Sequence, residues 1–171
     1  MKGSGIMKKV IAMVVILCLV FVFSACNVVK KIEPVSVKLY FLDDNMNLAM
    51  ETREVTAENT WKAIVEEVVK GPTVTGLSPA VNGEVKVLSA EIVDGVCVVD
   101  LSEEFRTYNT GGSLTESLAI YSIVNSLCKN GAENVKINIE GDTEADFGGH
   151  FYLGDTFELE SNMIRIEDRY I

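Results

Sequence analysis

Two adjoining apolar segments, which flank Asp94-Gly95, constrain the fold of this chain more than any other feature of the sequence. Glu84–Val93 and Gly95–Leu101 are rich in Val and Ile, residues that favour β-strands. The Asp-Gly pair between them is a strong signal for the tight turn of a β-hairpin. The second segment contains Val96-Cys97-Val98-Val99, which is apolar on both faces, so we predict that it is a central strand of a sheet.

The rest of the sequence alternates between strand and helix patterns. Further strands are expected from Val35, at Leu48–Val55 and at Val135–Ile139. Apolar residues at helical spacing predict helices at Glu58–Lys70 and Ser113–Lys129. We therefore expect an α+β fold, a two-layer sandwich in which two helices pack on one face of a mixed β-sheet.

The longer predicted helix begins with Ser113-Leu114-Thr115-Glu116, which has the sequence of a capping box. In that motif the serine oxygen accepts a hydrogen bond from an amide of the first turn, and the glutamate accepts one from the serine amide. At the other end of the chain, Glu160–Ile171 has no clear pattern, and we expect a C-terminal extension there.

Residues 1–25 have the layout of a secretory signal. Two lysines precede an uncharged apolar run, Val10–Phe23, which is short for a membrane span. The run leads to Ser24-Ala25-Cys26, where small residues stand directly before a cysteine. This ending resembles the bacterial lipobox, which implies cleavage between Ala25 and Cys26 and a diacylglyceryl group on the Cys26 thiol. The alternative is a transmembrane anchor that keeps the apolar run.

Cleavage divides the chain into a signal peptide (1–25), a lipidated cysteine with its tether (26–34) and a single domain (35–171). The lipid holds this domain on the extracytoplasmic face of the cell membrane. Removal of the signal takes three lysines and no acid from a chain of net charge −10, which leaves −13. Such a surface repels phosphate backbones and anionic headgroups. We therefore expect no nucleic-acid binding, and membrane contact only through the lipid.

Cys97 and Cys128 remain after export, and both stand among apolar residues. An exported pair of cysteines can form a disulfide. Buried free thiols are favoured, because a domain of this length does not need a disulfide to be stable. The sequence has no C-x-x-C pair and no Cys/His cluster, so it predicts neither a metal site nor a cofactor.

Few residues offer catalytic chemistry. His150 is the only histidine; it can be a general base, but we favour ring hydrogen bonds that hold its loop against the sheet. Asp142, Glu144 and Asp146 alternate in an acidic loop that lacks the glycine and the final acid of a calcium-binding EF-hand. A solvated loop is therefore favoured over a cation site. These four residues are the candidates for a ligand or loop contact.

Asp100-Leu101-Ser102 ends the predicted central strand, and two glutamates follow it. Carboxylates in this region can act as a glycosidase pair. We instead expect Asp100 and Ser102 to bind backbone amides at the strand end. Trp61 lies on a helical apolar stripe, so we expect it in the core and not on a sugar-binding surface.

Three long segments occur in a fixed order: VKVLSAEIVDGVCVVDLSEEF, GGSLTESLAIYSIVNSLCKNGAENVKINIEG and GGHFYLGDTFE. Together with VKLYFLDDN, ETREV and VEEVVKGP, they resemble the GerMN domain of sporulation and spore germination lipoproteins over Val37–Glu158. The resemblance implies a small αβ fold similar to the ring-building modules of sporulation complexes, and it implies no catalytic residue. This chain has one copy of the domain, whereas the sporulation protein of the family has two.

The signal and the resemblance together predict a non-catalytic, lipid-anchored module. It assembles with extracytoplasmic proteins or with itself, in sporulation, germination or another envelope complex. An exposed sheet edge or the loop Thr73–Gly83 offers a contact surface. A module that binds cell-wall glycan or a small ligand is the alternative. An envelope hydrolase that uses His150 with Asp100 or a loop carboxylate is less favoured.

Overall fold

The structure is a computed structural model that describes residues 31–108 and 111–171. Ile32–Ile171 forms one compact unit. The predicted signal peptide and most of the tether lie outside the described residues. Within the described part of the chain, no helix has the length and hydrophobicity needed to cross a membrane.

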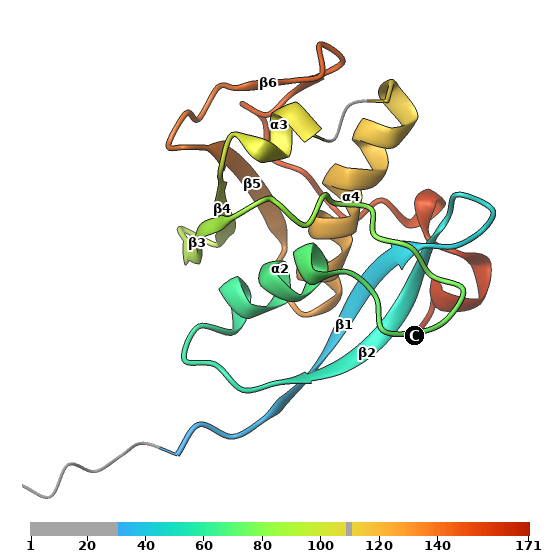
Figure 1. Cartoon of the computed structure of the whole chain (residues 1–171). Coiled ribbons are helices and arrows are strands. Elements are labelled where there is room, and N and C mark those ends of the chain that lie inside the picture. The colour runs from blue at the N-terminus through green and yellow to red at the C-terminus, as the bar shows by residue number, and fades with distance from the viewer. Residues whose placement is uncertain (1–30, 109–110) are drawn as a thin grey trace, which may run out of the picture. The chain divides into compact units, whose positions relative to one another are not determined.

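The first two strands form a separate antiparallel hairpin (Figure 1). β1 (Val35–Leu42) pairs with β2 (Leu48–Val55) along its whole length. The Asp43 carboxylate closes the turn between them, because it accepts hydrogen bonds from the backbone amides of Asn45 and Asn47, both at 2.9 Å.

Val37, Leu39 and Phe41 face the main core, as the sequence pattern predicts. The other face is not left to solvent near the turn, because Tyr40 and Leu48 are fully buried there in a second apolar cluster.

A three-stranded mixed sheet contains the predicted central strand. β4 (Val96–Leu101) lies between β3 (Val87–Val93), which is antiparallel to it, and β5 (Asn134–Ile139), which is parallel to it. The Asp94-Gly95 turn joins β3 to β4, as predicted. β3 begins later than the expected Glu84, and its pairing with β4 is irregular near its start.

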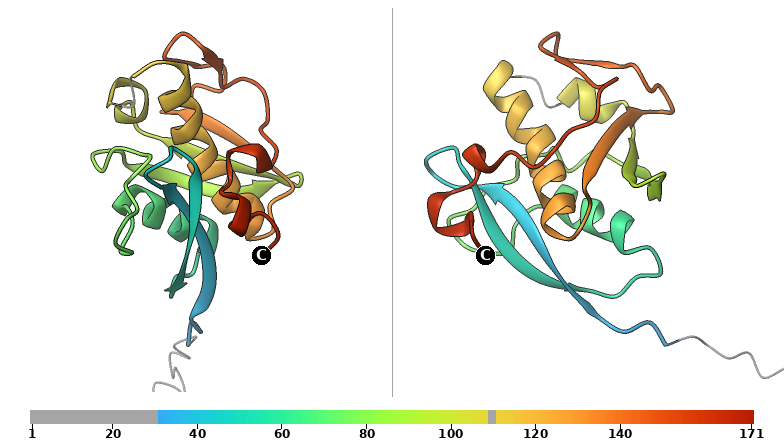
Figure 2. Two further views of the ribbon diagram at one scale, coloured as in Figure 1. Left: turned by 90° about the vertical axis from the view of Figure 1, so that its right-hand side faces the viewer. Right: turned by 180° about the vertical axis from the view of Figure 1, so that it is seen from behind.

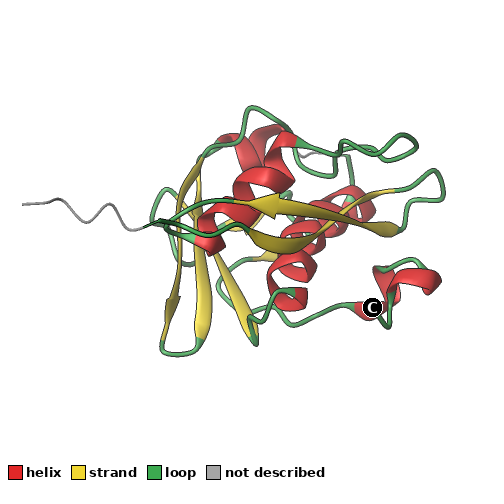
Figure 3. Ribbon diagram, turned by 90° about the horizontal axis from the view of Figure 1, so that it is seen from below, coloured by secondary structure: helices red, strands yellow, loops and turns green. Residues whose placement is uncertain are grey.

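Two helices pack against both groups of strands. α2 (Thr60–Lys70) contacts β1 and β3, and α4 (Ser113–Lys129) contacts β1 and β5. Figure 3 shows the hairpin and the three-stranded sheet as separate groups of strands with the helices beside them. The predicted α+β class, with two helices on a mixed sheet, is therefore confirmed. The first hairpin forms a sheet of its own and does not extend the mixed sheet.

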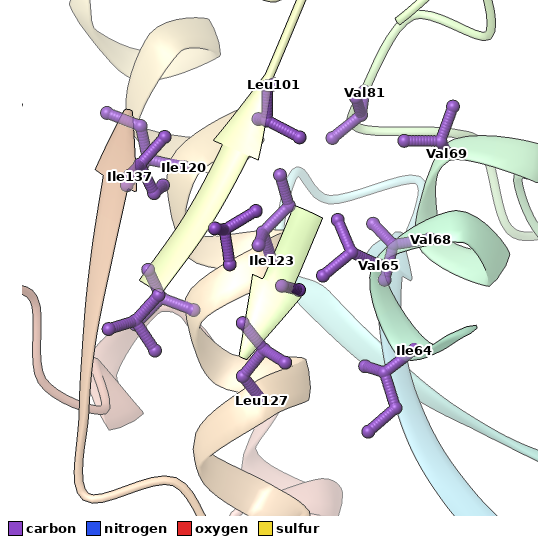
Figure 4. Packing of buried hydrophobic residues seen from close by; sticks show 14 of the residues in the cluster. Ile64, Val65, Val68, Val69, Val81, Leu101, Ile120, Ile123, Leu127 and Ile137 are labelled. Carbon is purple, nitrogen blue, oxygen red and sulfur yellow. The ribbon is translucent and has the colours of Figure 1, made fainter. Parts of the chain in front are cut away.

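The buried core lies where α2, α4 and the mixed sheet meet. Figure 4 shows Val65 and Val68 of α2, Ile123 and Leu127 of α4 and Leu101 of β4 in one apolar cluster. All five side chains are 0% exposed. Burial of an aliphatic side chain of this size contributes about 2 kcal/mol, so these contacts hold the helices on the sheet.

Polar side chains of α4 bind the outer edge of β1. Ser126 Oγ accepts a hydrogen bond from the Tyr40 amide at 3.0 Å, and Ser122 Oγ donates to the Tyr40 carbonyl at 2.6 Å. Asn130 bonds with both backbone groups of Lys38, at 3.1 and 2.7 Å. These residues, which we call the α4 polar ladder, lie on one line of the helix because they are four positions apart. The ladder occupies the place of a neighbouring strand and so keeps the hairpin separate from the mixed sheet.

The predicted capping box at the start of α4 is wrong. Gly112 is the N-cap residue, with a φ of 93° and no side-chain cap among the described residues. Ser113 is already helical, and Glu116 is buried with His150 as its partner. The local pattern fails here because the glutamate bonds with a loop that is distant in the sequence.

The predicted C-terminal extension lies along the hairpin (Figure 2). Residues 160–169, here called the strap, contain two short 3-10 turns, η1 (Ser161–Met163) and η2 (Ile166–Asp168). Ile164, between these turns, forms a parallel bridge with Leu48 and is 0% exposed. The strap is therefore part of the packed fold.

Two hydrogen bonds fix the strap to the outer edge of β2. The Arg165 amide donates to the Leu48 carbonyl at 2.9 Å, and the Met50 amide donates to the Asp168 carboxylate at 2.9 Å. The strap thus covers the half of this edge that lies nearest the hairpin turn.

Candidate functional site

Most of the predicted site residues lie in the loops that follow β4 and β5. Three short elements shape this region: α3 (Glu104–Tyr108), β6 (Asp146–Phe147) and β7 (Phe151–Tyr152). Phe105 of α3 stacks on Phe147 of β6 with 4.7 Å between ring centroids, and both are fully buried. This stacking and contacts between β7 and α4 place the β6–β7 hairpin beside α4.

His150 contacts a buried carboxylate of α4. Its Nδ1 lies 2.8 Å from Glu116 Oε2. The Glu116 side chain is 3% exposed, whereas that of His150 is 52% exposed. A carboxylate beside Nδ1 favours a proton on that nitrogen and leaves Nε2 without this contact. The pair holds the loop against helix α4, whereas we had expected the sheet.

Gly148 lets the loop backbone approach this carboxylate. Its φ is +62°, a conformation that favours glycine. A Cβ at this position would overlap the Glu116 carboxyl group. The turn before His150 is therefore shaped by the buried glutamate as well as by its own backbone.

The acidic loop is held by its own backbone and faces Arg106. Asp142 accepts a hydrogen bond from the Glu144 amide at 3.0 Å. Hydrogen bonds that Arg106 donates to the Glu103 carboxylate, at 2.8 and 2.6 Å, raise the pKa of Arg106, and the charges of Asp142 and Asp146 add to this rise. Among the described residues, no three His, Cys, Asp or Glu side chains are grouped to hold a metal ion.

Asp100 and Ser102 bind backbone amides, as we predict. Asp100 Oδ1 accepts a hydrogen bond from the Gly141 amide at 3.0 Å, and Ser102 Oγ accepts one from the Lys86 amide at 2.9 Å. They tie the end of β4 to the turn after β5 and to the segment before β3. Trp61 is partly buried against the core, which is also its predicted place.

Sequence reasoning missed a buried carboxylate on β2. Glu51 is 4% exposed and accepts bonds from the Thr73 amide at 2.9 Å, the Thr73 hydroxyl at 2.6 Å and the Val74 amide at 3.2 Å. Arg53 bridges Glu51 and Glu67, each at 2.5 Å. The sequence does contain a signal for this carboxylate. In a strand whose side chains alternate between two faces, Glu51 and Arg53 occupy positions that point inward. This network fixes the start of the loop that we considered a contact surface.

The two cysteines of the described region lie in or beside the core. Cys97 is buried, Cys128 is half-buried, and both are free thiols. Burial raises the pKa of Cys97 to about 12 and that of Cys128 to about 11, which disfavours the thiolate. Ala25 and Cys26, the predicted cleavage and lipidation residues, lie outside the described residues.

Two open hollows flank the turn of the first hairpin. Their volumes are about 270 and 370 Å³, and both are lined by Asp43, Asn45 and Arg165. The strap forms one wall, and Val74–Leu77 forms a wall of the larger hollow. Both are lined mainly by polar groups, among them a carboxylate, an amide and a guanidinium.

Three comparisons relate this chain to known proteins. The family described as "Germane: Sporulation and spore germination" matches residues 38–145, more than half of the chain. No curated protein matches it. Among solved structures, the tandem GerMN domains of the sporulation protein GerM from Bacillus subtilis have a TM-score of 0.60 at 19% identity. That match covers 82% of this chain and 50% of the tandem protein, so this chain spans half of its length.

Two further structures share the fold. The first GerMN domain of Bacillus subtilis GerM alone has a TM-score of 0.57 at 22% identity, over 78% of this chain and 99% of that domain. A candidate lipoprotein from Clostridium perfringens has a TM-score of 0.53 at 21% identity, over 73% of this chain and 87% of that protein. At these identities the likeness establishes the fold alone.

The family match and the fold agree on the same part of the molecule. Residues 38–145 run from β1 to the acidic loop and include both long helices and the whole mixed sheet. The chain therefore belongs to the Germane family of sporulation and spore germination proteins, and its fold is that of a GerMN domain.

Proposed function

We propose that this chain is a non-catalytic interaction or assembly module, anchored by lipid on Cys26 at the extracytoplasmic face of the cell membrane. Residues 1–25 are its signal peptide, 26–34 its lipidated tether and 35–171 its single domain. Its partners are extracytoplasmic proteins or further copies of the chain. Its process is sporulation, germination or the assembly of another envelope complex, and membership of the family supports the first two.

The observation that carries this proposal is that candidate catalytic side chains hold the backbone of the domain together. Asp100 and Ser102 bind backbone amides. Each of these contacts joins segments that are distant in the sequence. Side chains used in this way build a rigid scaffold, which is what a contact module needs. The candidate lipoprotein of the same fold supports the anchor.

Metabolic labelling tests the anchor. Cells fed an alkyne-bearing fatty acid should label the wild-type chain, and the Cys26→Ser variant should lose the label. The Cys128→Ser variant, which changes a half-buried thiol of the domain, should keep it. Equal labelling of wild type and Cys26→Ser would place the lipid elsewhere.

Crosslinking in living cells tests the assembly role. The full chain, attached to its own membrane, is crosslinked and the joined proteins are identified by mass spectrometry. We expect a reproducible set of envelope proteins or the chain itself. If repeated experiments joined no protein to the chain, the assembly role would be wrong.

Binding of cell-wall glycan is the alternative function, and the hollows beside the first hairpin offer its site. Co-sedimentation with purified peptidoglycan tests it. If the chain co-sediments saturably with peptidoglycan and crosslinks to no protein, glycan binding is favoured. If the chain does not co-sediment with peptidoglycan, this alternative is wrong.

A further inference from the structure

Several strand edges of the domain are covered by other parts of the chain. The α4 polar ladder and a bridge between Leu42 and Ser78 cover the outer edge of β1. Phe157 exchanges two hydrogen bonds with Val135, at 2.9 and 2.7 Å, and so covers β5. The strap covers half of β2. Covered edges are protected against pairing with other chains.

The outer edge of β3 differs because it carries exposed apolar side chains. Leu88, Ile92 and Val93 are 43%, 43% and 48% exposed. In Figure 1, β3 lies at the left margin of the domain, with no further strand beside it. Exposed apolar residues on an unpaired strand edge are typical of a site that accepts another strand.

The backbone of β3 is open at the same place. Side chains before and within α2 bind two of its outward carbonyls: Asn59 binds that of Ala90 at 2.8 Å, and Lys62 binds that of Leu88 at 3.3 Å. Outward groups alternate along an antiparallel strand, so the amide and carbonyl of Ile92 also point away from β4. Within residues 31–108 and 111–171, no group bonds with either of them.

Acidic side chains surround this open end. Glu91 and Asp94 stand on either side of Ile92 and Val93, and both acids are exposed. Glu58, also exposed, precedes Asn59, which touches β3. Lys62 also reaches this edge, at the Leu88 carbonyl, but the acids outnumber it, so the local charge favours a basic partner.

We propose that the open end of the β3 edge, around Ile92, receives an extended segment of a partner protein as an added strand. In the added strand, the residue opposite Ile92 is apolar, because it meets the exposed Ile92 side chain. The residues opposite Glu91 and Val93 lie on the other face of the sheet, and a basic side chain there meets the carboxylates of Glu91 and Asp94. The segment therefore alternates apolar and basic residues. This inference rests on the proposed assembly role and assigns its contact surface.

The remaining open stretch of β2 suits such a partner less well. Its outward residues are Thr52 and Glu54, which follow Met50 in the same alternation. Both side chains are polar or charged, as on an edge protected against pairing. This stretch serves as the matched control.

Hydrogen exchange measured by mass spectrometry tests the proposal. The full chain is purified in detergent micelles and mixed with a capped seven-residue peptide of alternating Lys and Val. We expect slower exchange in fragments that contain Val87–Val93. A peptide of alternating Glu and Val should leave this exchange unchanged. The proposal is wrong if the basic peptide leaves β3 unprotected, or if both peptides protect it equally.

Two variants separate strand addition from unspecific attraction. Ile92→Pro removes an amide that β4 does not use, so we expect at least tenfold weaker peptide binding. Thr52→Pro, the same change on β2, should bind like wild type. Should Ile92→Pro fail to fold, the pair Glu58→Lys and Glu91→Lys, two exposed acids outside the β3–β4 turn, decides, with binding expected to weaken roughly three- to tenfold. Unchanged binding by the charge-reversed chain would overturn the proposal.

The test of the β3 edge and the test of the proposed assembly role can fail independently. Protein partners found in cells, without peptide protection of β3, would overturn this surface and leave the assembly role standing. Peptide protection of β3 without partners in cells would support the surface and contradict the assembly role.

Discussion

Glu51 shows how a single buried charge can fix a long loop. Burial by itself raises its pKa, but hydrogen bonds from Thr73, Arg53 and Val74 outweigh this and lower the pKa to about 2. A carboxyl group with a lowered pKa stabilises the folded state when it is ionised. Its contribution is therefore complete above its ordinary pKa of 4.5 and is lost as the pH falls towards 2.

Glu51→Gln should remove this pH dependence. At neutral pH we expect the variant to lose about 3 kcal/mol of unfolding free energy. Between pH 5 and 2, as a rough window, the wild type should lose stability more steeply than the variant. Urea unfolding across this range measures both effects. Glu54→Gln, an exposed acid on the same strand, is the control and should follow the wild type.

Gly148→Ala should destabilise the domain more than an equivalent change elsewhere. The new Cβ overlaps the Glu116 carboxyl group and also forces a left-handed φ on alanine. Gly95→Ala has a similar φ of +87° but meets no atom within 4 Å, so it should cost only about 1 kcal/mol. Thermal unfolding compares the two. The double variant Glu116→Ala, Gly148→Ala should recover part of the difference; strictly additive losses would contradict the overlap.

At the scale of elements, the α4 polar ladder replaces a strand by a row of side chains. Ser126→Ala leaves the buried Tyr40 amide without its acceptor, so we expect a loss of about 1–3 kcal/mol. Ser117→Ala is the matched change, because the Ser117 hydroxyl bonds only within the helix, to the Ser113 carbonyl. Faster hydrogen exchange at Tyr40 in Ser126→Ala alone would verify the ladder. Equal behaviour of both variants would argue against it.

Periodic segments could be predicted from the sequence because their apolar faces repeat. The Asp94-Gly95 turn, the central position of β4 and the helices α2 and α4 follow from residue order alone. The separation of the first hairpin does not, since it depends on serine and asparagine side chains that look solvent-exposed in a helical pattern. The strap also lacks a pattern, because it is held by backbone bonds to β2 and by one buried isoleucine.

For Asp100 and Ser102 the sequence predicts the kind of role, because polar residues at a strand end commonly bind backbone amides. It does not predict their partners, Gly141 and Lys86, which are distant in the sequence. The partner of His150 was not predictable, since Glu116 fits a capping motif equally well by sequence. Only the fold brings the loop to α4 and decides between these uses of the same carboxylate.

At the scale of the whole molecule, the strap links the end of the chain to its first hairpin. Ile164→Ala should cost about 2–5 kcal/mol, because this side chain is 0% exposed between Leu48 and Leu118. Ile166→Ala, two positions later and 69% exposed, should change stability by at most about 0.5 kcal/mol. Denaturant unfolding of the two variants measures the difference. Similar losses would mean that the strap contributes little to the fold.

The strap also sets the order in which the chain can finish folding. The bond between Met50 and Asp168 joins positions 118 residues apart. A polypeptide is made from its N-terminus, so the hairpin emerges before the residues that cover it, and contacts between such distant positions form late. Half of the outer edge of β2 therefore stays uncovered until the strap has been made and has packed onto it.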